Sequence, residues 1–171
     1  MARTRRADYV RSNRILILKL EDPAAPAAIA RRLLSVHDAL SRRVLGGDLL
    51  AALAERTGAR PPELVVPDLH QPHRREGGRI VYSLQGDYRR RRPSPSDPEV
   101  ARGGRPLGRI RVLNRTPARG DAVRPSAFLN TLLHEFCHHH DAEVLDLLHS
   151  FHTGGFYARL RHLKGQMGLH V

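Results

Sequence analysis

The sequence has a single cysteine, no tryptophan and no long apolar run. Cys137 has no second cysteine to pair with, so the 171-residue chain forms no internal disulfide and contains no four-cysteine zinc ribbon. The early apolar run at residues 15–18 ends at Lys19. It is far shorter than the ~20 residues that cross a membrane and short for the apolar part of a signal peptide. We therefore expect a soluble, unexported, cytoplasmic protein, in a compartment where thiols stay reduced.

Acidic residues are also scarce. The chain has 17 Asp and Glu against 29 Lys and Arg, nearly all of them Arg, which gives a net charge of +12. Because such a charge attracts polyanions, an alternative function is a basic nucleic-acid-binding protein whose zinc site is structural or inactive. Aromatic residues are only 5% of the chain and do not alternate with basic ones, as they do where bases are stacked. The arginine run at residues 89–92 is more typical of a solvated surface.

Apolar spacing predicts two helices in the N-terminal half, after a loose basic arm at residues 1–14. The first helix has an amphipathic stripe at spacings of three and four, formed by Ile29, Leu33, Val36, Leu40 and Val44. We expect the glycine pair at residues 46–47 to end this helix. Asp48 would then cap a second, shorter helix that ends at Gly58.

The remainder of the chain predicts an α+β domain. Two segments with alternating apolar residues predict strands, 79–84 and 107–113. Prolines and glycines predict loops, mostly over 59–78 and 114–124, and a mobile surface loop over 86–106. Helical spacing returns at residues 125–148 and 156–164. The length predicts one domain over residues 1–171, with 107–164 as the core of the site described next.

His134, Glu135 and His138 form the pattern H-E-x-x-H on a predicted helix. Residues four apart lie one turn apart on the same helix face, so two imidazoles there are able to reach one zinc ion. Glutamate at the intervening position lies at the flank of that face, where it would act as general base on a zinc-bound water. On a helical wheel, the apolar residues of this segment cluster on a different side, which separates the core face from the proposed ligand face.

A catalytic zinc site needs a third protein ligand. No glutamate follows Glu143, so the downstream candidates are His149, His152, His162 and Asp146. We favour His152, because it precedes a glycine pair where the chain is able to turn back.

The same helix carries three further polar residues close to the proposed ligands. Asp141 lies one turn from His138 and is a candidate to accept the second ring N–H of a ligand histidine, although a plain surface aspartate is an equal alternative. His140 falls in the apolar sector and is expected to be a satisfied, half-buried histidine. His139 lies at the border and is expected at the surface.

The pattern H-E-x-C-H followed by H-x-x-x-F resembles the SprT-like zinc metallopeptidases. The segment Leu-Gly-x-Ile-x-Val at residues 107–112 is also similar to that family, and the resemblance covers about residues 106–163. It implies a zincin-like α+β fold, in which the H-E-x-x-H helix packs on a small β-sheet and the N-terminal helices complete the core. It also implies Zn²⁺ on His134, His138 and His152, with Glu135 as base and Phe156 in the core. Thr153-Gly154 stands where family members often have Gly-Pro.

These patterns together predict a zinc-dependent metallopeptidase acting on a protein or peptide substrate. Glu135 would take a proton from the attacking water and deliver it to the leaving amine. Tyr157, His149 and Arg159 are candidates for stabilising the oxyanion. A zincin that binds metal and cleaves nothing is the remaining alternative, because metal ligands also contribute folding energy without chemistry.

Overall fold

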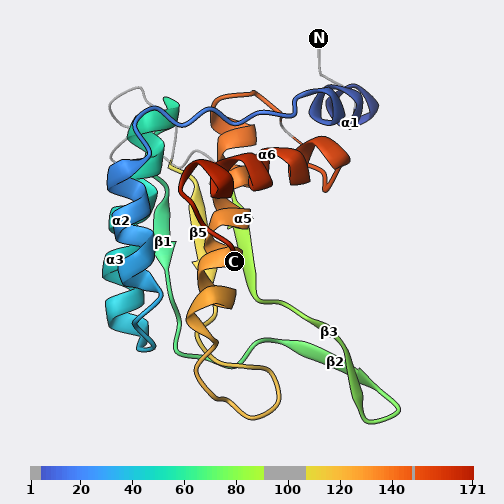
Figure 1. The fold of residues 1–171 in the computed structure, drawn as a ribbon. Coiled ribbons are helices and arrows are strands. Elements are labelled where there is room, and N and C mark those ends of the chain that lie inside the picture. Colours follow the sequence, from blue (N-terminus) through green and yellow to red (C-terminus); the bar gives the residue numbers. More distant parts are fainter. Residues whose placement is uncertain (1–4, 91–106, 148) are drawn as a thin grey trace, which may run out of the picture.

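The computed structural model describes residues 5–90, 107–147 and 149–171, and its fold is α+β (Figure 1). A three-stranded sheet has the order β1-β5-β4, with β1 spanning Glu63–Val65, β4 Gly86–Arg89 and β5 Arg109–Val112. β1 runs parallel to β5, and β4 runs antiparallel to it. β4 is therefore an edge strand among the described residues.

One face of this sheet is apolar and covered by helices. Ile110 and Val112 of β5 are buried, while Arg109 and Arg111 alternate with them and pair with Glu63 and Asp87. Helix α5, Pro125–Glu143, packs on β4 and β5, and α3, Ala39–Thr57, packs on β1 and on α5. The alternation predicted for residues 107–113 is confirmed, because it matches a sheet with one covered and one polar face.

The helix boundaries in the N-terminal half differ from those predicted. α2, Ala24–Leu33, ends early, and α3 begins after Asp38, whose carboxylate accepts a hydrogen bond from the backbone N–H of Ser41 at 2.8 Å. The chain then continues as helix through residues 46–47. A Cβ at Gly46 would lie 2.7 Å from Leu64 Cδ2, so this glycine permits close packing on β1 and does not end the helix. The predicted cap at Asp48 was wrong, whereas Gly58 ends α3 as predicted, with φ of 74°.

Part of the predicted apolar stripe does not face the core. Leu33 is fully buried, but Leu40 is 63% and Val44 54% exposed. The stripe was predicted for one continuous helix, and the break between α2 and α3 changes the direction in which the later residues point.

Several predicted loops contain regular structure. The arm expected at residues 1–14 is helical over α1, Arg5–Arg14. β1 and β2, His73–Glu76, lie inside the segment 59–78, and β4 lies at the start of the segment 86–106. Residues 91–106 of that predicted loop lie outside the described residues. The strand predicted at 79–84 is confirmed as β3, Arg79–Ser83, which pairs with β2 in a separate hairpin that projects from the body (Figure 1).

The C-terminal half contains the two helices that were predicted there. α5 ends at Glu143, five residues before its predicted end, and Asp146 just beyond it has φ of 48°. The last helix, α6, spans Gly154–Gln166. The core joins fully buried side chains of α3, α5 and α6, among them Leu50, Leu53, Phe128, Leu132, Phe136 and Phe156. None of the described helices combines the length and the apolar character that a membrane span requires.

Candidate metal centre

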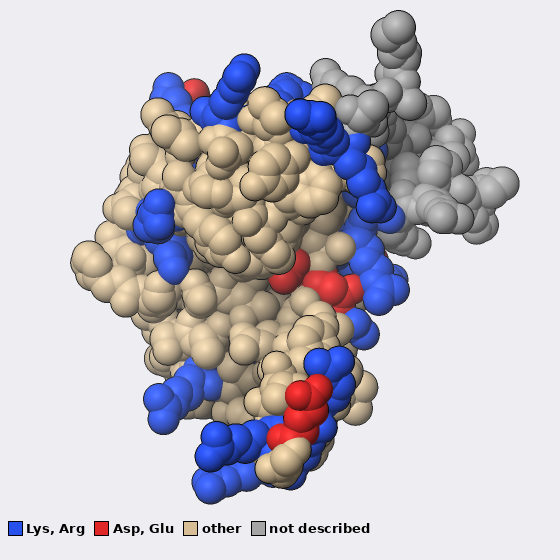
Figure 2. Space-filling model, turned by 90° about the vertical axis from the view of Figure 1, so that its right-hand side faces the viewer, with Lys and Arg blue, Asp and Glu red and all other residues tan. Residues whose placement is uncertain are grey.

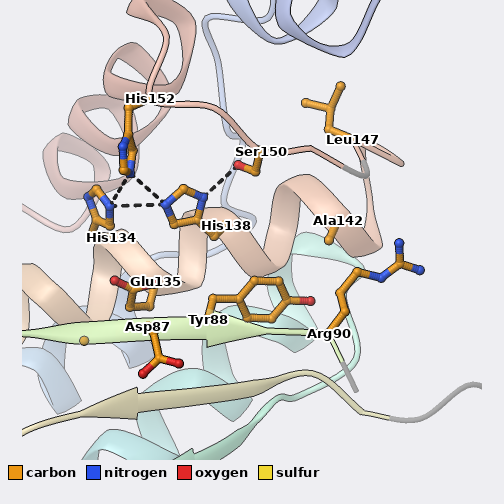
Figure 3. A pocket seen from close by; sticks show the side chains of 11 residues that line it. Asp87, Tyr88, Arg90, His134, Glu135, His138, Ala142, Leu147, Ser150 and His152 are labelled. Atoms are coloured by element: carbon orange, nitrogen blue, oxygen red, sulfur yellow. Dashed lines mark hydrogen bonds between the residues drawn. The ribbon is translucent and has the colours of Figure 1, made fainter. Parts of the chain in front are cut away.

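Three histidines from α5 and from the loop before α6 meet at one point. His134 Nε2 lies 2.9 Å from His152 Nε2 and 3.2 Å from His138 Nε2, and the third side of this triangle is 3.0 Å (Figure 3). His134 and His138 lie one turn apart on α5, as their spacing predicts. Among the described residues, these are the histidine, cysteine and acidic side chains that come together closely enough to hold a metal ion.

The triangle fits a divalent ion better than it fits direct hydrogen bonds. Three nitrogens that each lie ~2.0–2.1 Å from a tetrahedral zinc ion are ~3.4 Å apart. The distances found here, 2.9–3.2 Å, are somewhat shorter, so the rings would move slightly apart to hold the ion. A neutral imidazole has one N–H and one lone pair, so three Nε2 atoms facing one another do not satisfy each other. Burial, and secondarily the neighbouring histidines, lower the pKa of His134 to about 4 and that of His138 to about 3, which favours the neutral, metal-binding form.

The ring of Phe156 orients all three histidines. It is fully buried at the start of α6, and its centroid lies 4.5 Å from His138, 5.0 Å from His134 and 5.3 Å from His152. Because each imidazole rests on this one ring, the rotation of each is limited by packing. The expectation that Phe156 lies in the core is confirmed.

A hydrogen-bond relay behind His138 assigns its tautomer. Ser150 Oγ donates to Asp141 Oδ2 at 2.7 Å and lies 2.8 Å from His138 Nδ1. Because the single hydroxyl proton of Ser150 goes to the carboxylate, the hydroxyl oxygen accepts from His138, whose proton is then on Nδ1. The lone pair of His138 is therefore on Nε2, which faces the other two histidines. Asp141 is fully buried and is not a surface aspartate. It accepts from Ser150 and does not accept directly from His138, as the sequence had suggested it would.

Asp141 is itself held by a buried arginine. Arg159 of α6 donates from Nε to Oδ1 at 3.0 Å and from Nη2 to Oδ2 at 2.7 Å, and both side chains are fully buried. Burial raises the pKa of Asp141, and the two hydrogen bonds from the guanidinium oppose that rise. Since Arg159 points into the protein, it is not available as an oxyanion donor, and that suggestion from the sequence was wrong.

Glu135 lies beside the triad, between α5 and β4 (Figure 3). Its side chain is largely buried, and this burial raises its pKa to about 7. The negative charge of Asp87 raises the pKa further, whereas a hydrogen bond with the backbone of Tyr88 lowers it. A carboxyl group with a pKa near neutrality is able both to accept and to return a proton at physiological pH.

Open space lies along α5 on both sides of the triad. A cavity of about 450 Å³ extends towards the C-terminal end of α5 and is lined by Tyr88, Arg90, Ala142, Leu147 and Ser150 beside the histidines (Figure 3). A second cavity, of about 370 Å³, extends the other way, past Thr131 to Tyr82 at the base of the hairpin. Both include Glu135 and Gly86, so the two cavities form one groove between α5 and β4.

Gly86 determines how closely β4 approaches α5 at the groove. A Cβ at this position would lie 2.7 Å from Thr131 Cγ2, 2.9 Å from the carbonyl oxygen of Arg111 and 3.4 Å from Glu135 Cγ. Only glycine lets β4 approach α5 this closely opposite Glu135. The sequence alone gave no signal for this contact, because Gly86 was assigned to a loop.

The other candidate residues lie elsewhere. His149 stays outside the triad, since its ring Nδ1 lies 3.1 Å from Asp8 of α1. His162 Nδ1 lies 2.8 Å from the carbonyl oxygen of Leu18. Tyr157 is 44% exposed and its ring stacks on His152, with centroids 5.9 Å apart. Of the third-ligand candidates, the structure brings His152 to the pair.

Two histidines of α5 differ from expectation. His139 was expected at the surface but is fully buried, where its Nε2 donates to the carbonyl oxygen of Arg60 at 2.7 Å. His140 is buried as expected, but its Nδ1 has no hydrogen-bond partner among the described residues, so it is not a satisfied histidine.

The groove is lined by Asp87, Glu135 and Arg90, whereas many basic side chains lie further out. Figure 2 shows Lys and Arg side chains along the margins of this side of the molecule and a hollowed centre largely free of them. Asp87, which lies beside the groove, is engaged by Arg89 and Arg111 at 2.6 Å each. The visible basic groups gather mainly along the edges of this side and leave the hollow largely free of them, and nucleic-acid binding stays a prediction.

No family model, curated protein or solved structure matches this chain. The resemblance to SprT-like peptidases therefore rests on the residues of the H-E-x-x-H helix, on His152 and Phe156, and on the strand before them.

Proposed function

We propose that this protein is a zinc-dependent metallopeptidase with a zincin-like fold, of the SprT-like kind. The observation that carries the proposal is the convergence of three Nε2 atoms beside a buried glutamate in an open groove. His134, His138 and His152 would hold the ion, and three protein ligands leave a position for water, as in catalytic rather than structural zinc sites.

When bound, zinc acidifies a coordinated water and polarises the scissile carbonyl. Glu135 accepts a proton from the attacking water on its carboxylate and returns it to the leaving nitrogen. Burial raises the pKa of Glu135 in the metal-free protein, and the charge of a bound zinc ion would favour the carboxylate that accepts the proton. Tyr157, which stacks on His152, is the candidate to donate a hydrogen bond to the oxyanion.

β4 has no partner strand on its outer edge among the described residues, and this edge supports a peptide as substrate. Antiparallel pairing alternates which backbone groups face the neighbouring strand. Leu113 N–H donates to the carbonyl oxygen of Gln85 at 2.9 Å, so the alternation leaves the groups of Gly86 and Tyr88 on the side away from β5. The backbone of Tyr88 also forms a hydrogen bond with Glu135. An extended peptide that pairs with this edge would run along the groove beside Glu135.

The test combines metal content and proteolysis in one pair of proteins. Purified wild-type chain is expected to retain zinc and to cleave an unfolded protein such as casein. Glu135→Gln should retain zinc while its rate falls by at least ~10², because the ligands are intact and only the proton acceptor is lost. Unchanged cleavage by a zinc-loaded Glu135→Gln protein would remove Glu135 from the mechanism.

A second result separates catalysis from a purely structural site. If the wild-type chain binds zinc in the triad and cleaves no protein or peptide in a broad substrate screen, the interpretation as a zincin without activity replaces the proposal. Tyr157→Phe refines the active case: we expect a lower kcat with a nearly unchanged KM, because the hydroxyl would act only in the transition state.

A further inference from the structure

The N-terminal helix α1 is attached to the protein almost entirely by polar contacts. Its buried residues are Asp8 and Ser12, both fully buried, while its apolar Tyr9 and Val10 are 51% and 42% exposed. A helix with this pattern gains little from apolar burial. Its position is set by the specific hydrogen bonds that Asp8 and Ser12 make, one helical turn apart.

Ser12 contacts Arg159 and Thr153, two residues that support different histidines of the metal centre. Its carbonyl oxygen accepts from Arg159 Nη1 at 2.9 Å, and its Oγ accepts from Arg159 Nη2 at 3.1 Å. Ser12 Oγ also forms a hydrogen bond with Thr153 Oγ1, 3.1 Å away, in which either hydroxyl is able to donate. Arg159 leads through Asp141 to the relay behind His138, and Thr153 follows His152 in the chain. Ser12 is therefore a common partner of the supports of two proposed ligands.

The other contacts of α1 follow the loop that carries His152. Asp8 Oδ2 accepts from the backbone N–H of His149 at 3.1 Å, and the ring of Tyr9 meets that of Phe151 edge-on at 5.9 Å. Asn13 Oδ1 accepts from the backbone N–H of Gly155 at 3.2 Å. Together with Ser12, these residues contact every second position of the segment 149–155.

The approach of α1 to this loop is also very close. A Cβ at Gly155 would lie 2.1 Å from the carbonyl oxygen of Ser12 and 2.9 Å from Asn13 Cα. Glycine at this position is what allows the backbone of α1 to reach the start of α6.

The three proposed ligands differ in how they are held. His134 and His138 are placed by α5 itself, whereas His152 lies in a segment with no helix or strand of its own. An unrestrained loop loses conformational entropy when its histidine is fixed on an ion, and a loop already held in place loses less.

We propose that α1 is a clamp on the segment 149–155, in which Ser12 and Asp8 are positioning residues that set the affinity of the His134–His138–His152 site for its ion. This inference rests on the proposed metal site. It deepens that proposal by making metal affinity depend on a helix more than a hundred residues away in the sequence.

The experiment measures the zinc affinity of the full chain by competition with a chromophoric chelator. Ser12→Ala should weaken zinc binding ~10- to 100-fold, as loss of residues that orient metal ligands commonly does. Asp8→Ala, which removes the contacts with His149, should weaken it several-fold. Val10→Ala lies on the exposed side of the same helix and should stay within about twofold of wild type. His152→Ala gives the affinity of the two remaining ligands.

A second measurement keeps the test valid if Ser12→Ala folds poorly. In metal-free protein, amide hydrogen exchange in 149–155 should be faster in Asp8→Ala than in Val10→Ala, with exchange in α5 unchanged. Zinc affinity in both Ser12→Ala and Asp8→Ala equal to wild type, while His152→Ala is weakened, would overturn the clamp and leave the metal site standing. Absence of zinc binding by wild type would overturn the proposed function and the clamp's role in it.

Discussion

Two fully buried arginines hold different regions of this molecule, and they do so in different ways. Arg159 ends on a buried carboxylate, Asp141, and through it reaches the histidine triad. Arg42 of α3 ends on neutral oxygens of residues that do not line the groove. Both arginines are equally buried, but Arg159 positions residues of the metal centre, whereas Arg42 holds loops of the fold in place.

The contacts of Arg42 connect three segments around the N-terminal part of the core. Its Nε donates to the carbonyl oxygen of Val36 at 3.1 Å, Nη1 to Asn114 Oδ1 at 2.7 Å and Nη2 to the carbonyl oxygen of Val123 at 2.6 Å. The guanidinium also lies over the ring of Phe128, 4.8 Å from its centroid. These bonds fix loops against α3 and α5 without touching the groove.

The largest effect is expected from Arg159→Met. It leaves Asp141 buried without its counter-charge, which should lower the free energy of unfolding by ~3–5 kcal/mol and weaken zinc binding at least tenfold. Urea unfolding and chelator competition measure the two effects. The double variant Arg159→Met with Asp141→Leu is the control: it should regain much of the stability but not the zinc affinity, because the carboxylate that accepts from Ser150 is then absent.

Arg42→Met should lower the free energy of unfolding by ~2–3 kcal/mol, because it leaves buried oxygens of Asn114 and Val123 without their donors. The zinc affinity, measured at neutral pH without denaturant, should remain that of wild type. A loss of zinc affinity as large as that of Arg159→Met, in protein shown to be folded, would erase the distinction between the two arginines.

Gly155→Ala sharpens the comparison with a smaller change. The added Cβ meets the backbone oxygen of Ser12 at 2.1 Å, which displaces α1 from Arg159 and should cost ~1–2 kcal/mol together with part of the zinc affinity. Gly165→Ala is the matched control in the same helix, since its Cβ meets nothing within 4 Å. That variant should be more stable than wild type by ~0.5–1 kcal/mol, with unchanged zinc binding.

The smallest effect concerns the acid sensitivity of the Arg42 region. Hydrogen bonds from Arg115 and Asn114 lower the pKa of Asp68 to about 2 from its ordinary 3.8. The carboxylate therefore contributes stability that is full above about pH 4 and is lost as the pH falls through 2. Asp68→Asn should show a shallower loss of stability between pH 4 and 2 in urea titrations. An identical acid profile for variant and wild type would contradict this role.

The sequence was most informative where chemistry follows local spacing. His134, Glu135 and His138 were predicted together because one helical turn places them close to one face. His152 and Phe156 were predicted because a glycine pair and the start of a helix directly follow His152. Gly46 misled the prediction, because a glycine within a helix has the same local signal as one that ends it. The role of Gly46 becomes visible in the structure, where Leu64 of β1 packs against it and leaves no room for a Cβ.

The supports of the site could not be predicted, because they depend on contacts between distant segments. Ser12 is separated by 141 residues from Thr153, and nothing in the basic sequence around it distinguishes a clamp from a loose arm. β4 was missed for a related reason. Its glycine and its polar Asp87 lack the apolar alternation of a half-buried strand, and pairing with β5 supplies what the local pattern does not.

X-ray absorption spectroscopy of the zinc-loaded wild-type protein tests the central assignment most directly. We expect one zinc ion per chain with three imidazole nitrogens at ~2.0–2.1 Å and oxygen completing the coordination shell, and one imidazole fewer in His152→Ala. A shell that contains sulfur, or one that is the same in wild type and His152→Ala, would contradict the assignment of His134, His138 and His152 as the ligands.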